Sequence, residues 1–117
     1  MGIAAKQLGL VLGAAGVMGW AGMVLPLFAE DAPISLTIKN HRFDPPELQV
    51  PAGVKLRLLV KNLDGTPEEF ESHSLHREKV VAGGGEITVF IGPLDPGTYD
   101  FFGDFNPTTA QGRIIAK

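Results

Sequence analysis

The residues most able to do chemistry lie in one short stretch, residues 68–79, which holds four glutamates and two of the three histidines. If residues 69–73 are extended, Glu69, Glu71 and His73 point to one side of the strand, and Phe70 and Ser72 point to the other. Two carboxylates and an imidazole that converge on one point suit a divalent cation such as Cu(II), Fe(II), Mn(II) or Zn(II). This alternation therefore predicts a metal site.

The same stretch offers further ligands and also a simpler interpretation. His76 follows His73 at a spacing of three, which places both on one face if the segment is helical, and Glu78 follows two residues later. The simpler interpretation is that Phe70 faces the core while the flanking glutamates are only solvated surface charge. In addition, the sequence from Thr66 to Glu69 fits a helix start, with a threonine cap, a proline and a glutamate that completes a capping box. His41 lies beside a turn and is interpreted as a surface histidine.

Sulfur ligands are missing from the candidate site. The chain has no cysteine, which excludes disulfides, thiolate zinc sites, iron–sulfur clusters, cysteine nucleophiles and copper centres that need a thiolate. The methionines Met1, Met18 and Met23 all precede residue 30. Hydrolytic motifs are also missing, since Gly83-Gly84-Gly85 is typical of a turn between strands and not of a phosphate-binding loop.

Size and charge narrow the function classes further. The chain has 117 residues, enough for one domain, and 10 Lys+Arg against 13 Asp+Glu give a net charge of −3. No basic face is available for nucleic acid. The hydrophobic fraction of 44% is too high for a disordered tail.

The first 29 residues differ from the rest. Lys6 is the only charged residue before Glu30, residues 8–25 are apolar and rich in glycine, and the segment ends at Ala29. This pattern predicts a secretory signal peptide over residues 1–29, followed by one exported domain over residues 30–117. An uncleaved membrane anchor is the alternative, because the apolar run approaches the ~20 residues that span a bilayer. Both interpretations place the domain in the periplasm.

The elements that must position the candidate ligands are predicted to be strands. Apolar residues alternate with polar ones, and turn signals rich in glycine and proline separate the runs. About seven short strands and no long helical pattern indicate an all-β sandwich or barrel. The predicted strands centre on residues 34–38, 48–50, 54–60, 80–81, 87–91, 99–102 and 113–116.

Three motifs in order carry a family resemblance. They are Phe43-Asp44-Pro45 through Gly53, then Glu69-Phe70-Glu71-Ser72 with residues 78–81, and residues 94–102 followed by Phe105-Asn106-Pro107. Together they resemble the cupredoxin-like family, and more narrowly its EfeO-type domains, small periplasmic proteins associated with bacterial ferrous-iron uptake. The resemblance implies a Greek-key β-sandwich.

The resemblance also implies which ligands are lost and which are kept. The copper ligands of electron-transfer cupredoxins fall at about Glu69, at Gly103 and Asn106, and near Ala110, so all four are replaced and a type 1 copper site is excluded. The carboxylate-rich site of EfeO-type members matches Glu69 and Glu71. Asp104 lies in the loop of Gly103 and Asn106 and could supply another oxygen.

The predicted function combines these points. We expect a periplasmic protein that binds iron or another divalent transition metal such as copper through Glu69, Glu71 and His73, with His76, Glu78 or Asp104 as further ligands. Its expected role is accessory, in metal uptake or handling beside a membrane iron permease or a periplasmic iron-uptake protein. The alternative is a metal-free module that docks to such a partner through its acidic loop. Oxidation of ferrous iron would need an electron acceptor and an open coordination position, and no motif indicates either, so no enzymatic activity is assigned.

Overall fold

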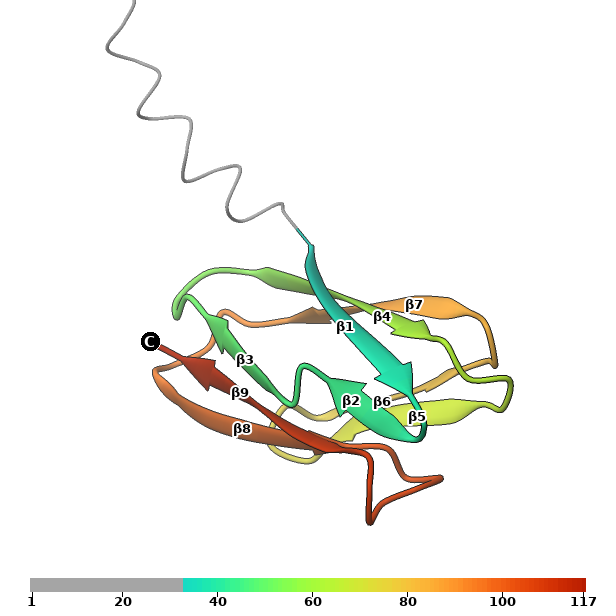
Figure 1. The fold of residues 1–117 in the computed structure, drawn as a ribbon. Coiled ribbons are helices and arrows are strands. Elements are labelled where there is room, and N and C mark those ends of the chain that lie inside the picture. Colours follow the sequence, from blue (N-terminus) through green and yellow to red (C-terminus); the bar gives the residue numbers. More distant parts are fainter. Residues whose placement is uncertain (1–32) are drawn as a thin grey trace, which may run out of the picture. The chain divides into compact units, whose positions relative to one another are not determined.

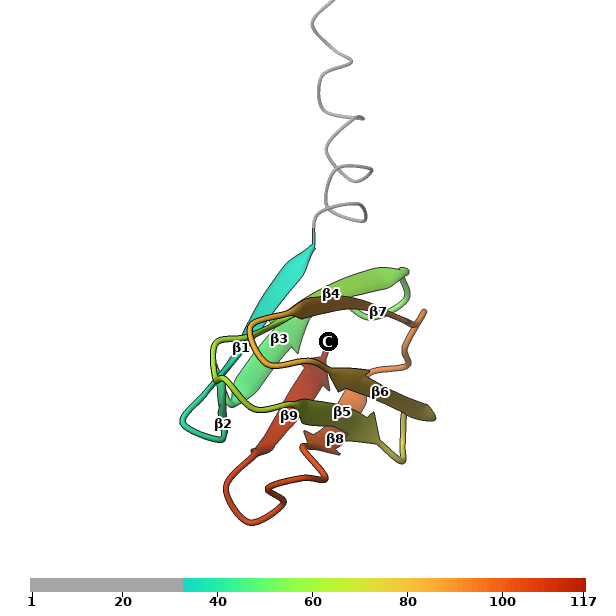
Figure 2. The same ribbon diagram turned by 90° about the vertical axis from the view of Figure 1, so that its right-hand side faces the viewer.

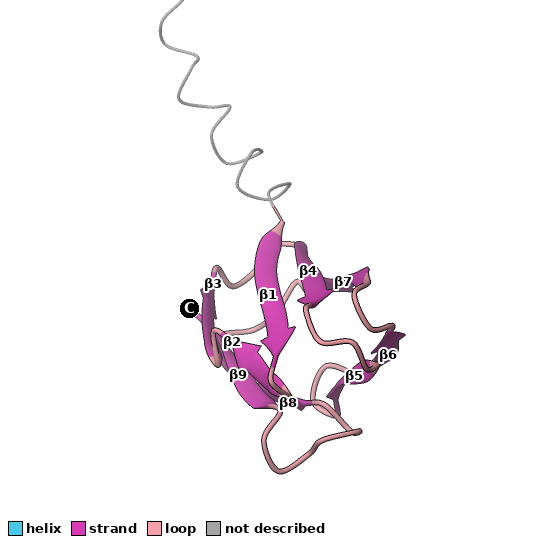
Figure 3. Cartoon of the chain, turned by 45° about the vertical axis from the view of Figure 1, so that its right-hand side comes forward, coloured by secondary structure: helices cyan, strands magenta, loops and turns pink. Residues whose placement is uncertain are grey.

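The computed structural model describes residues 33–117, so the predicted leader, residues 1–29, lies outside the described residues. The described part consists of strands and loops (Figure 3). It contains no helix that could span a membrane. The strands are β1 (Ile34–Lys39), β2 (Arg42–Asp44), β3 (Glu47–Val50), β4 (Leu56–Asn62), β5 (Glu68–Ser72), β6 (Arg77–Val81), β7 (Glu86–Ile91), β8 (Gly97–Phe102) and β9 (Gln111–Ala116).

The strands form two mixed sheets that face each other, as Figures 1 and 2 show. One sheet has the order β2-β1-β4-β7 and the other the order β3-β9-β8-β5-β6. Among the strands of residues 33–117, β1 pairs with β4 and β3 with β9 in parallel, and the other pairs are antiparallel. The predicted all-β sandwich is confirmed, with β2 and β5 in addition to the seven strands expected from the sequence.

The core fills the space between the sheets with the apolar residues that alternate along each strand. Leu36 and Ile38 of β1 and Leu58 of β4 are fully buried. The rings of Phe43 and Phe101 meet edge to face with centroids 5.0 Å apart, a favourable aromatic geometry. Burial of this apolar surface is the main force that holds the sheets together.

The stretch of residues 68–79 is a β-hairpin, and the helix start suggested for its first residues is wrong. Phe70 is fully buried, and β5 pairs with β6 on one side and with β8 on the other. Insertion between two strands buries four of the five residues of β5, and this outweighs a local capping pattern. The two histidines do not share a helix face, because they lie in the turn after β5, where His76 has a φ of 55°.

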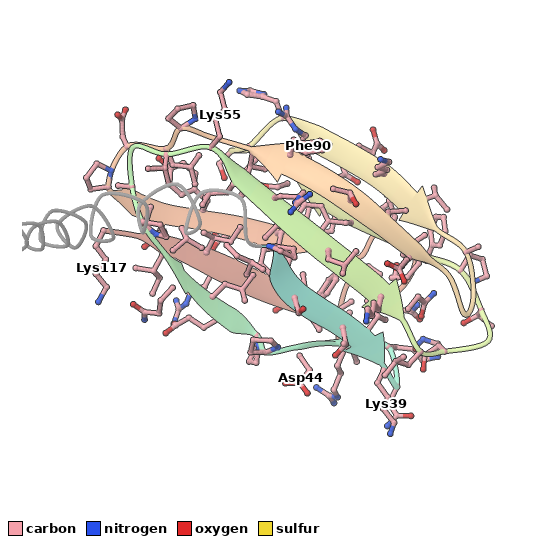
Figure 4. The ribbon with its side chains drawn as sticks, turned by 90° about the horizontal axis from the view of Figure 1, so that it is seen from above. Lys39, Asp44, Lys55, Phe90 and Lys117 are labelled. Carbon is pink, nitrogen blue, oxygen red and sulfur yellow. The ribbon has the colours of Figure 1, made fainter. Side chains whose placement is uncertain are left out.

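Two side chains fix the loops at the end of the sandwich that carries the β1–β2 turn. Asp64 accepts hydrogen bonds from the backbone N–H groups of His41 and Asn40, at 2.9 and 2.8 Å, and these bonds lower the pKa of its carboxyl group. Asn62 is buried and donates to the carbonyl of Thr66 at 2.8 Å. Lys39 marks this end in Figure 4, and Lys117 marks the opposite end.

Side chains of β6 also cover the edge of β7 in the facing sheet. Arg77 Nε donates to the carbonyl of Phe90 at 2.8 Å, and Lys79 Nζ donates to the carbonyl of Thr88 at 3.0 Å. The two sheets are therefore linked along this side by long cationic side chains.

Candidate functional site

Three carboxylates meet on the outer face of the five-stranded sheet. One carboxylate oxygen each from Glu69, Glu71 and Asp104 lies within 4.8 Å of the others. Glu69 and Glu71 share this face because they alternate with the buried Phe70 along β5. Glu71 pairs with Phe102 of β8, so Asp104, two residues beyond Phe102, comes close to Glu69. The antiparallel pairing of β5 and β8 therefore assembles the cluster.

The electrostatics of the cluster favour a cation. Glu69 is 7% exposed, and its Oε1 atom is buried without a hydrogen-bond partner. Glu78 lies directly opposite Glu71 on β6, an unfavourable pairing of like charges. Burial, and then the neighbouring carboxyl groups of Glu78 and Glu71, together raise the pKa of Glu69 to about 7. A bound cation would satisfy the free oxygen and offset the repulsion.

The other predicted ligands lie around this cluster. His73 Nδ1 is 4.0 Å from Glu71 Oε2, and its exposed ring rests against Phe102 with centroids 5.3 Å apart. His76 belongs, with Glu71, His73 and Glu78, to the lining of an open hollow of about 460 Å³. The structure thus gathers Glu69, Glu71 and Asp104, places Glu78 beside them, and keeps both histidines outside the three-carboxylate group.

Sequence reasoning missed Glu68, the residue before Glu69. Its carboxylate points inward and is 1% exposed. Oε1 accepts hydrogen bonds from the N–H of Glu69 at 2.9 Å and of Phe105 at 3.0 Å, and Oε2 accepts one from Asn106 Nδ2 at 2.7 Å. The alternation along the strand could have indicated its burial, because Glu68 lies two residues before the core residue Phe70 and so faces the same side of the sheet.

The position of Glu68 also shows which glutamate of β5 meets the positions that the resemblance gives to the other copper ligands. A Cβ atom at Gly103 would lie 2.6 Å from Glu68 Cδ and 2.8 Å from Ala110 Cβ. Glu68, and not Glu69, therefore meets the residues that stand at the other ligand positions. This corner offers a carboxylate, an amide and a methyl group and no thiolate, so a type 1 copper site does not fit it.

The fold, together with the inner corner at Glu68 and Gly103, defines the class of protein. It is a small two-sheet sandwich of the kind that carries blue copper, without the thiolate that such copper needs. The chain belongs to the cupredoxin-like domain family, which matches residues 10–116. A relative, an uncharacterized protein of Rickettsia prowazekii, is 51% identical over 84 residues, which cover 72% of this chain and 67% of the relative.

Solved structures show the same fold at low sequence identity. Auracyanin A, a blue copper protein from Chloroflexus aurantiacus, has a TM-score of 0.63 at 15% identity, with 74% of this chain and 98% of auracyanin covered. The metal-binding domain of the Cu(I)-exporting P-type ATPase CopA of Streptococcus pneumoniae, solved with Cu(I), has a TM-score of 0.62 at 12% identity, with 73% and 84% covered. A Cu(I) form of an amicyanin variant has a TM-score of 0.59 at 17% identity, with 76% and 89% covered.

Proposed function

We propose that this cupredoxin-like protein binds a divalent transition-metal ion on the outer face of β5, through Glu69, Glu71 and Asp104. The observation that carries the proposal is the buried Oε1 atom of Glu69, which has no hydrogen-bond partner and belongs to a cluster of carboxylates. A buried acceptor without a partner is costly, and a cation satisfies it together with its charged neighbours.

The ligand set determines which ions fit. Carboxylate oxygens suit Mn(II) and Fe(II), and a rotation of His73 toward Glu71 would add an imidazole that also suits Cu(II). Cu(I) prefers thiolate and thioether ligands, and residues 33–117 contain neither cysteine nor methionine. The ions expected to bind are therefore iron, manganese and Cu(II).

The cellular setting belongs to the same proposal. The apolar segment before residue 30 supports export to the periplasm, with or without retention as an anchor. The three sequence motifs support an accessory role in iron uptake or copper handling, with transfer of the ion to a membrane permease or a periplasmic iron-uptake protein. Copper is supported separately by the relatives of similar fold, which are described as copper proteins.

Calorimetric titration of two alanine variants tests the proposal. Glu71→Ala removes a candidate ligand and should abolish both the heat of binding and the thermal stabilisation by Fe(II) or Cu(II). The control, Glu47→Ala, removes an exposed carboxylate of the same sheet that pairs with Arg113 at 2.9 Å, and it should bind like the wild type. Equal affinity of the two variants would eliminate the site.

The second candidate function is metal-free docking to a protein partner. Val80, which lies opposite Glu69 on β6, is 52% exposed, and Phe105 is 49% exposed, so apolar side chains flank the acidic cluster. Such a combination suits a binding surface. Elemental analysis of untagged protein separates the two functions: a stoichiometric transition metal supports the metal site, whereas a negligible content with no stabilisation by added metal supports docking.

A further inference from the structure

The loop that carries Asp104 is tied to β5 by a single buried carboxyl group. Asp104 is exposed, and the residues that follow it are held by Glu68: the Phe105 N–H donates to Oε1 at 3.0 Å, and Asn106 Nδ2 donates to Oε2 at 2.7 Å. On the other side of Asp104, the missing Cβ of Gly103 leaves the space that the Glu68 carboxyl group fills.

The loop itself is closed by backbone hydrogen bonds, so it behaves as one unit. The N–H of Gly103 donates to the carbonyl of Ala110 at 2.8 Å, and the N–H of Ala110 donates to the carbonyl of Asn106 at 2.8 Å. The position of this loop relative to β5 sets the distance between Asp104 and Glu69. The Glu68 side chain connects β5 to the loop, and Glu68 precedes Glu69 directly in the chain.

From this geometry we infer that Glu68 is a positioning residue for the metal site. Its buried carboxyl group holds the β8–β9 loop so that Asp104 lies beside Glu69 and Glu71, while Glu68 itself does not contact the ion. The inference rests on the proposed function and adds a residue on the inner face of β5 to it. Partners that orient metal ligands in this way typically contribute tenfold to a hundredfold in metal affinity, as an order of magnitude.

This role also accounts for the altered corner of the fold. The family resemblance assigns copper ligands to the positions of Gly103, Asn106 and Ala110, where an ion would join the loop to β5. In this chain the Glu68 carboxylate makes that connection by hydrogen bonds. The inner corner is therefore filled, and the ion is bound on the outer face of the same strand.

An exchange of donor and acceptor tests the inference in the full chain, with Mn(II) as the probe. Asn106→Asp sets a second carboxylate against Glu68 and should displace the loop. The double variant Glu68→Gln/Asn106→Asp restores the bond with reversed polarity, because the new amide donates to the new carboxylate. Asn106→Leu removes the Nδ2 bond without adding charge, so it serves as a second test if two opposed carboxylates prevent folding.

The control is Asn62→Ala, which removes another buried polar side chain at the same end of the sandwich. The Asn62 side chain donates to the carbonyls of Thr66, Val81 and Ala82, and its hydrogen bonds do not involve the loop of Asp104. It should lower the free energy of unfolding, measured with urea and circular dichroism, and leave the Mn(II) dissociation constant within about threefold of wild type.

The dissociation constants come from the electron paramagnetic resonance signal of free Mn(II). We expect Asn106→Asp and Asn106→Leu to raise the constant by about tenfold or more, and the double variant to recover wild-type affinity. Wild-type affinity in both single variants, or no recovery in a folded double variant, would overturn the positioning role alone. A wild-type chain that binds no Mn(II), Fe(II) or Cu(II) would overturn the proposed function, and the positioning role with it.

Discussion

Glu68 and Glu69 are consecutive glutamates on one strand, and their surroundings are opposite. Glu68 faces the interior, where it accepts three hydrogen bonds from Glu69, Phe105 and Asn106. Glu69 faces outward, where Glu71, Glu78 and Asp104 surround it and its buried Oε1 atom has no partner.

The difference shows that burial alone does not mark a functional carboxylate. A buried carboxylate with donors on both oxygens stabilises the fold, because removing it would leave those donors unsatisfied. One surrounded by other carboxylates is destabilising in the absence of a cation. Within this strand, the inner glutamate therefore stabilises the fold, and the outer one is the glutamate that we propose as a metal ligand.

The largest expected contrast is in the stability of the metal-free protein. Glu68→Ala removes the acceptor of three hydrogen bonds at the buried Glu68 site and should lower the free energy of unfolding by about 3 kcal/mol. Glu69→Ala relieves repulsion and should leave this free energy unchanged or raise it. Urea unfolding followed by circular dichroism, with a chelator present, measures both. Equal losses in the two variants would remove the distinction.

A smaller effect on the free energy of unfolding is expected from a substitution that fills the space next to Glu68. Gly103→Ala places a Cβ against the Glu68 carboxyl group and should cost about 2 kcal/mol. In the Glu68→Ala background the clash with the carboxyl group is gone and the close contact with Ala110 Cβ remains, so the added methyl group should cost less and a double-mutant cycle should show coupling between the two sites.

The control for this cycle is Gly65→Ala, where an added Cβ meets no atom within 4 Å, and it should change stability little in either background. Strictly additive losses for Gly103→Ala and Glu68→Ala would show that the carboxyl group does not fill the space.

The smallest expected effect is a pH dependence that Glu69 contributes. The pKa of Glu69 is raised from its ordinary 4.5 to about 7 in the folded protein, so the native state holds this proton more tightly than the unfolded chain does. The contribution of Glu69 to stability therefore falls as the pH rises from 4.5 to 7, and the loss is complete above that range. Screening by solvent near this surface reduces the loss to about 1–2 kcal/mol.

Glu69→Gln has no proton to lose and supplies the reference. The difference in unfolding free energy between wild type and this variant should change across pH 4.5–7 in the metal-free protein, and Mn(II) should diminish it above pH 7. A constant difference over that range would contradict the raised pKa.

The sequence predicted the parts of the fold where alternation is regular. The β4 region and β7 alternate apolar and polar residues almost without interruption, since one face of each is buried in the core. In β5 four of five residues are polar, and three of the four polar ones are buried. The local sequence could not predict this strand firmly, because its burial depends on neighbouring strands.

The candidate site also has a part that the sequence predicted and a part that it could not predict. Alternation along residues 69–71 predicted that Glu69 and Glu71 share a face, and the structure confirms this orientation. The contacts of Glu68 could not be predicted, because its partners Phe105 and Asn106 lie 37 and 38 residues further along the chain. The metal itself stays a prediction that the experiments above decide.

The cationic side chains between β6 and β7 have a consequence for behaviour at high concentration. Each open sheet edge can pair with a strand of another molecule and so start aggregation. Here the carbonyls of Phe90 and Thr88 are already occupied by Arg77 and Lys79, so an incoming strand would have to displace two charged groups before it could add to β7. A domain without disulfides thereby protects this exposed edge with its own side chains.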